Sequence, residues 1–83
     1  MMVNYDIYRG LVDWLILQRN LNGLTQLQLS KLLGKNQSFV SKYENCEQNL
    51  ILIEFMEICS ILDCDPTVEI KGVINAIKTE RNN

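Results

Sequence analysis

Residues 25–44 read Thr-Gln-Leu-Gln-Leu-Ser-Lys-Leu-Leu-Gly-Lys-Asn-Gln-Ser-Phe-Val-Ser-Lys-Tyr-Glu, and this stretch decides the fold. Thr25, followed three residues later by Gln28, is the capping-box signature of a helix start. Gly34 supplies a residue that turns the chain freely. Asn36 is a good N-cap for a second helix, expected from residue 37 to about residue 45. The stretch therefore predicts two short helices joined by a tight turn.

The second of these helices has an apolar side and a polar side. Val40 and Tyr43 are spaced to lie on one side and are expected to anchor the helix on the core. The opposite side carries the polar residues Gln37, Ser38, Ser41 and Lys42. Side chains of these types reach base edges and phosphates in the major groove of DNA. The pair is therefore predicted to be a helix-turn-helix, and DNA binding is the leading hypothesis.

The first helix of the pair is expected to turn three of its residues, Leu29, Ser30 and Leu33, toward the core. Ser30 is small where the two helices must cross closely. These positions predict that the two helices pack directly on each other.

The composition is that of a folded protein with a single domain at residues 1–83. Apolar residues make up 47% of the 83 residues and charged residues 22%. No apolar run is long enough to span a bilayer, and no basic region followed by an apolar one marks a secretion signal. We therefore expect a cytoplasmic protein with no membrane partner.

Three cysteines and no histidine limit the chemistry that this chain can support. The cysteines are Cys46, Cys59 and Cys64. Their odd number argues against a disulfide framework, three separated thiols do not complete a zinc site, and a catalytic thiol would lack its imidazole base. We expect no catalytic residue, no metal and no cofactor, and hence no enzyme.

The net charge of −2 counts against a nucleic-acid partner until its distribution is considered. From Arg19 to Asn45 there are four basic residues and one acid, whereas from Cys46 to the end there are three basic residues and seven acids. The positive region coincides with the helix-turn-helix. The acidic half is expected to face away from DNA.

Helical patterns continue on both sides of the central stretch, at residues 6–20, 50–62 and from Pro66 to residue 78. The last helix carries an apolar stripe at Ile70, Val73, Ile74 and Ile77. Ten of the thirteen residues from 50 to 62 are apolar, more than one core-facing side requires. We therefore expect an all-α domain of five helices, in which the helices over residues 50–78 complete the core and form a homodimer interface. The polar residues 79–83 are expected to fray.

With these residues in place, the chain resembles the Cro and phage-repressor-like helix-turn-helix family, also called the xenobiotic-response-element family. The resemblance covers about residues 15–67 and rests on Arg19, Gly23 to Gln26, Leu29 to Gly34 and Gln37 to Glu44, whose spacing agrees without a gap. It implies a five-helix, lambda-repressor-like DNA-binding domain. It also implies a transcriptional regulator, of repressor or controller type, that binds a palindromic operator in double-stranded DNA.

The resemblance also implies roles for individual residues. Gln26 would bond a phosphate and brace Gln37, which occupies the position of a base reader. Ser38, Ser41 and Lys42 would face the groove, and Lys35 and Asn36 would meet phosphate. Arg19 and Glu44 match a pair that ties the first helix to the end of the third, a structural role.

Two departures from the family pattern support an alternative. The loop at residues 45–49 carries no positive charge and one acid, although Asn45 can still take a left-handed turn. Leu27 is apolar where the family usually has a charged residue. The alternative is a protein-interaction module of the same fold, such as an antitoxin or an inhibitor, whose partner is a toxin or another protein and whose DNA binding is weak or lost.

Overall fold

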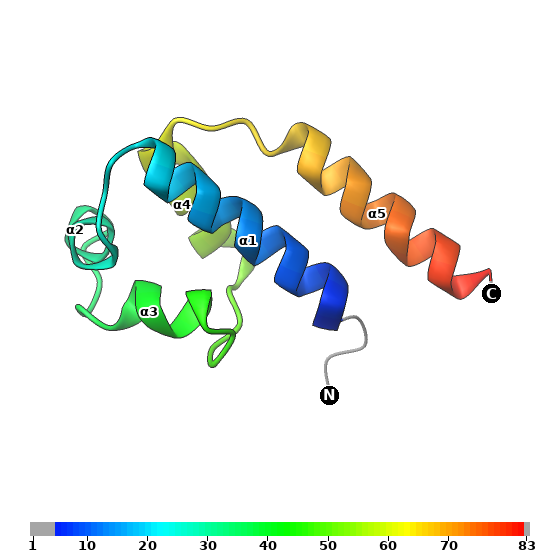
Figure 1. The fold of residues 1–83 in the computed structure, drawn as a ribbon, viewed down its shortest axis with the longest axis horizontal. Helices are drawn as coiled ribbons and strands as arrows, with labels where there is room; N and C mark the ends of the chain where they lie inside the picture. Colours follow the sequence, from blue (N-terminus) through cyan, green and yellow to red (C-terminus); the bar gives the residue numbers. More distant parts are fainter. Residues whose placement is uncertain (1–4, 83) are drawn as a thin grey trace.

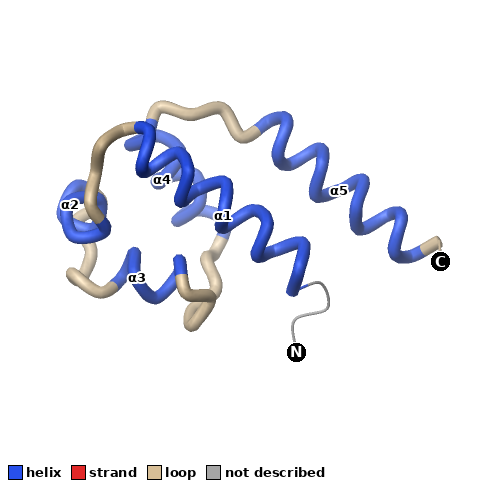
Figure 2. The backbone as a smooth tube through the Cα atoms, viewed as in Figure 1, coloured by secondary structure: helices blue, strands red, loops and turns tan. Residues whose placement is uncertain are grey.

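The computed structural model describes residues 5–82, which form five α-helices and, over that range, no strand. The helices are α1 (Tyr5–Leu21), α2 (Gln26–Leu32), α3 (Phe39–Glu44), α4 (Leu52–Leu62) and α5 (Thr67–Arg81). Helices α2, α3 and α4 gather around α1, and α5 runs antiparallel beside α1 and extends away from the other three (Figures 1 and 2). The predicted all-α fold of five helices is confirmed.

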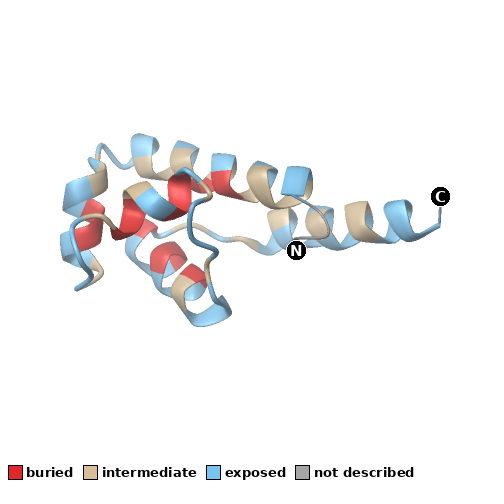
Figure 3. Ribbon diagram, turned by 90° about the horizontal axis from the view of Figure 1, so that it is seen from below, coloured by how far each residue is buried: buried red, intermediate tan, exposed pale blue. Residues whose placement is uncertain are grey.

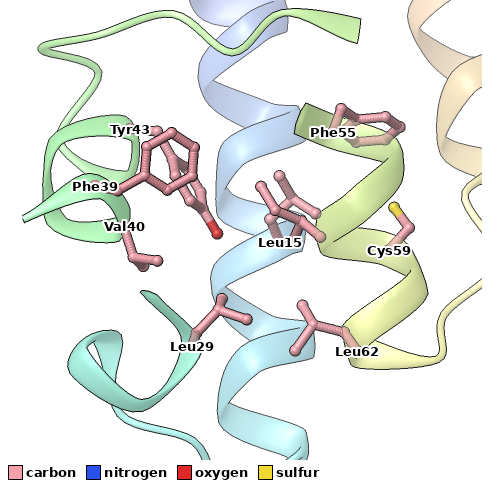
Figure 4. Packing of buried hydrophobic residues seen from close by; sticks show 9 residues of the cluster. Leu15, Leu29, Phe39, Val40, Tyr43, Phe55, Cys59 and Leu62 are labelled. Carbon is pink, nitrogen blue, oxygen red and sulfur yellow. The ribbon is translucent and has the colours of Figure 1, made fainter. Parts of the chain in front are cut away.

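The hydrophobic core lies where α1 meets α2, α3 and α4. It is built from Leu15, Leu29, Phe39, Val40, Tyr43, Phe55, Ile58, Cys59 and Leu62 (Figure 4). Val40 and Tyr43 are fully buried, as the spacing of the third helix predicts. Helix α5 has no buried residue, so the core is complete without it (Figure 3).

The turns around α2 confirm the sequence signals. The Thr25 hydroxyl accepts a hydrogen bond from the Gln28 backbone N–H at 3.0 Å, and the Gln28 side chain accepts from the Thr25 N–H at 2.8 Å. Gly34 has a φ of 69°, a conformation that costs glycine little and other residues more. The two helices therefore meet through the turn that the sequence predicts.

Helix α3 begins at Phe39, so the expected start at residue 37 is wrong. Asn36 does cap the chain, but its side-chain oxygen accepts from the backbone N–H of Ser38 at 2.9 Å, and its carbonyl accepts from Phe39 at 2.9 Å. These bonds close a turn over Gln37 and Ser38 before the helix starts. The first two residues of the polar face consequently lie in this turn.

Three further boundaries differ from expectation. Helix α4 starts at Leu52 rather than at residue 50, because the Leu50 N–H donates to the Tyr8 hydroxyl at 3.0 Å and Ile51 is the extended N-cap. Helix α5 continues to Arg81, so residues 79–81 are helical rather than frayed. In the loop after α3, the left-handed residue is Cys46 (φ 58°) and not Asn45.

Candidate nucleic-acid interface

The packing of α2 on α3 is fixed by a buried side-chain hydrogen bond as well as by shape. The Ser30 hydroxyl oxygen accepts a hydrogen bond from the backbone N–H of Val40 at 3.2 Å, and both residues are fully buried. That N–H belongs to the first turn of α3, which has no intrahelical acceptor for its donors. Ser30 is therefore small enough for the crossing and also satisfies a donor of the neighbouring helix.

The polar face of α3 divides into free and occupied side chains. Gln37 and Lys42 are exposed, and neither side chain is hydrogen-bonded to another residue within 5–82. Ser38 donates its hydroxyl to the Asn36 side-chain oxygen at 2.9 Å, and Ser41 donates to the Ser38 carbonyl at 3.0 Å. The amide of Gln37 and the ammonium of Lys42 are therefore the groups most available to a ligand.

Glu44, at the end of α3, is the centre of a buried ionic network. Its carboxylate accepts two hydrogen bonds from Arg19 of α1, at 2.7 Å from Nε and 3.0 Å from Nη2. A third bond, at 2.8 Å, comes from the side-chain amide of Gln26 in α2. Glu44 is only 3% exposed, and its hydrogen bond raises the pKa of Arg19. One carboxylate thus joins three helices.

This network changes the picture of Gln26. The amide nitrogen of Gln26 donates to Glu44, at the far end of α3, rather than bracing Gln37 at its start. The side chain is therefore held against the protein near the edge of the polar face.

Arg9 is a structural residue of this region that sequence reasoning missed. Its Nη1 donates to the Glu44 carbonyl at 2.8 Å and to the Cys46 sulfur at 3.5 Å, while Nη2 pairs with Asp13 at 2.9 Å. The guanidinium therefore ties α1 to the loop that follows α3. The sequence shows only the local pairing of Arg9 with Asp13, four residues apart, because the contact with Glu44 spans 35 residues.

Lys35 also has a partner within the protein. Its Nζ lies 3.9 Å from Oε2 of Glu54 in α4 and 5.5 Å from the centre of the Phe39 ring. Lys31 and Lys42, in contrast, are exposed and form no ion pair within the described residues. The positive charge near the helix-turn-helix is thus partly neutralised by the protein's own carboxylates.

Comparisons with known proteins agree with this arrangement. A family model described as helix-turn-helix matches residues 15–68. A solved structure described as an XRE-family like protein from Pseudomonas syringae pv. tomato str. DC3000 is 40% identical, covers 84% of this chain and 88% of that chain, and has a TM-score of 0.74. The chain belongs to the XRE family of helix-turn-helix proteins. No curated protein matches it.

The XRE-family fold is a DNA-binding fold of transcriptional regulators, which are not generally enzymes, so the expected family and general class of function are confirmed. Within the described residues, none of the helices of this XRE-family domain is long and apolar enough to cross a membrane.

In this XRE-family domain the apolar stripe of α5 has two separate environments. Val73 and Ile77 are half-buried and line a hollow with residues of α1, including Tyr8 and Leu11. Ile70 and Ile74 are 39% and 46% exposed. The stripe thus packs on α1 along one edge and leaves the other edge uncovered.

The first turns of α4 add to the exposed apolar surface of the XRE-family domain. Leu52 is 73% exposed and Met56 is 55% exposed. Leu52 and Ile70 line the same hollow between α1, the start of α4 and α5. Apolar side chains from two helices therefore border one uncovered region.

Proposed function

We propose that this protein is a transcriptional repressor that acts as a homodimer on a palindromic operator, with α3 in the major groove. The observation that carries the proposal is the pair of exposed side chains, Gln37 and Lys42, on an element whose other side is held by buried Val40 and Tyr43. A groove-reading element needs a fixed angle and free polar groups. The arrangement supplies both.

In this proposal Gln37 reads a base, since its amide offers one donor and one acceptor, the pattern that adenine matches in the major groove. Ser38, Ser41 and Lys42 make the other contacts of the polar face. The remaining residues, Gln26, Lys35 and Asn36, lie at its edges and contact phosphates. Arg19 and Glu44 hold the geometry and stay away from the DNA.

The dimer proposal rests on the uncovered apolar surface of α5 and α4. A second copy would cover Ile70 and Ile74, while Val73 and Ile77 contribute from the edge shared with α1. Exposed apolar surface of this kind is typical of an association site. Two-fold symmetry would place the two α3 elements on half-sites about 34 Å apart, one helical turn of DNA.

The DNA proposal is tested by fluorescence anisotropy with labelled DNA from upstream of the protein's own gene, at two salt concentrations. We expect saturable binding that weakens with salt. Gln37→Ala should reduce discrimination between operator and altered sites, whereas Lys42→Ala should weaken binding to all sequences alike. Absence of binding at micromolar dimer would contradict the proposal.

The dimer proposal is tested separately by analytical ultracentrifugation. Ile74→Glu should shift the protein toward monomer, because a carboxylate cannot be buried without a partner in an apolar interface. Val68→Glu is the matched control: it is 76% exposed and lies on the opposite side of α5 from Ile74. Equal mass for both variants would remove α5 from the interface.

A second candidate is a protein-interaction module that keeps the fold without useful DNA affinity. Leu27, 44% exposed in the first turn of α2, favours it, together with the loop at residues 45–49 that carries no cation. A partner such as a toxin would then cover the apolar positions. Failure to bind DNA, combined with an intact fold, would favour this candidate.

A further inference from the structure

Few cations near the helix-turn-helix are free to meet phosphate. Arg9 pairs with Asp13 at 2.9 Å and Arg19 with Glu44 at 2.7 Å. Lys35 pairs with Glu54, which leaves Lys31 and Lys42 as the unpaired cations of α2 and α3 within the described part of the chain. Because counterion release by lysine and arginine supplies much of DNA affinity, each cation that the protein neutralises itself matters.

Lys35 is the one paired cation that is both near the polar face and accessible. It lies in the turn between α2 and α3, with its side chain 36% exposed, whereas that of Arg19 is 12% exposed. Its ammonium approaches the Phe39 ring at 5.5 Å and the Glu54 carboxylate at 3.9 Å. A half-exposed pair of this length is weak, so Lys35 can leave Glu54 for a stronger anion.

Glu54 is held in place independently of Lys35. Its Oε1 accepts a hydrogen bond from the Ile51 backbone N–H at 3.1 Å, which caps the start of α4, while Oε2 faces Lys35. The Glu54 side chain is 15% exposed. A carboxylate is favourable in the first turn of a helix, so Glu54 stays there when Lys35 moves.

We propose that Glu54 is a positioning residue that limits the DNA affinity of this protein by holding Lys35 away from the phosphate backbone. On binding, Lys35 exchanges the Glu54 carboxylate for a DNA phosphate. The inference rests on the proposed DNA binding and adds to it a built-in competitor for one phosphate contact in each protomer.

The test compares Glu54→Gln with Glu57→Gln. Glutamine keeps an oxygen that can accept the Ile51 N–H and removes the negative charge. Glu57 lies one turn further along α4, is exposed and has no ion pair within residues 5–82, so its substitution makes the same change in net charge without freeing Lys35. Both variants should show the same urea unfolding midpoint as the wild type within error.

The probe is a fluorescein-labelled 30-base-pair duplex of mixed sequence, titrated between 50 and 200 mM KCl, so that no operator is required. Glu54→Gln should bind about two- to fivefold more tightly per protomer than Glu57→Gln, the range expected for releasing a weak ion pair. The slope of log K against log salt should steepen by about 0.9 for each added phosphate contact. A role confined to stability would leave this slope unchanged.

Lys35→Gln provides the decisive combination. If Glu54 acts through Lys35, the gain from Glu54→Gln should disappear in the Lys35→Gln background. A gain that persists there would mean that Glu54 repels phosphate directly, and equal affinities for Glu54→Gln and Glu57→Gln would mean that it does not act on binding; either result overturns the inference. If the wild type binds no duplex at any salt concentration, the proposed function fails together with it.

Discussion

Replacing Tyr43 by phenylalanine should stabilise the protein. Tyr43 is fully buried in the core, and its hydroxyl points from α3 toward α1 (Figure 4) with no hydrogen-bond partner among the described residues. The same burial raises the pKa of the phenol strongly. A buried hydroxyl without a partner costs about 1–3 kcal/mol. Phenylalanine removes that cost and keeps the edge-to-face contact with Phe39, whose ring centre lies 5.6 Å away.

We expect the free energy of unfolding of Tyr43→Phe to rise by about 1–2 kcal/mol. For a domain of this size each kcal/mol corresponds to about 4–8 °C in Tm. The measurement is urea and thermal unfolding followed by circular dichroism. DNA affinity should not change, because the ring lies on the buried side of α3.

Tyr8→Phe is the matched control for this prediction. It makes the same chemical change in α1, but the Tyr8 hydroxyl accepts a hydrogen bond from the Leu50 N–H at 3.0 Å. Its removal should therefore lower stability by about 0.5–1.5 kcal/mol. If Tyr43→Phe were also destabilising by about 1 kcal/mol or more, the Tyr43 hydroxyl would have a partner such as a buried water, and the reasoning would be refuted.

Three further predictions concern the network, the helix crossing and pH. Glu44→Gln should lower the free energy of unfolding by about 3–5 kcal/mol, because it leaves Arg19, only 12% exposed, without its counter-charge; a loss below about 1 kcal/mol in urea unfolding would show that the pair is dispensable. Ser30→Ala should cost about 1–3 kcal/mol through the orphaned Val40 N–H, whereas Ser60→Ala, at an exposed position of α4, should be neutral. Burial raises the pKa of the Cys59 thiol from 9.0 to about 12. Between these values the unfolded chain binds fewer protons than the folded protein, so stability is complete below pH 9 and falls by at most about 1.4 kcal/mol per pH unit as the pH rises toward 12. Urea midpoints at pH 8 and pH 10 should show this fall, reduced in Cys59→Ala, and a fall of equal size in the variant would assign it to other groups.

Much of the helix-turn-helix could be predicted from local signals. Thr25 with Gln28 marks the start of α2, Gly34 marks the turn, and the spacing of Val40 and Tyr43 marks the buried side of α3. Each of these signals acts over a few residues, through a cap, a backbone preference or a helical period. Local physics of this kind is legible in the chain itself.

The state of the candidate site could not be predicted in the same way. Lys35 and Gln26 have the side chains that DNA contacts require, yet one lies against Glu54 and the other against Glu44. Neither partner is near in sequence, so no pattern shows that the groups are engaged. The start of α3 was misplaced because Asn36 closes a turn first, and sequence signals do not distinguish that turn from the first turn of the helix.

The sequence by itself determined the helices, the caps, the buried face of α3 and the location of the positive charge, because these depend on residue type and on spacings of three or four positions. Only the tertiary structure decided which polar groups remain free. It left Gln37 and Lys42 available, engaged Lys35, and divided the α5 stripe into a half-buried edge and an exposed one. The physical reason is that ion pairs and burial depend on distances between residues that are 18 to 35 positions apart, and only folding sets those distances.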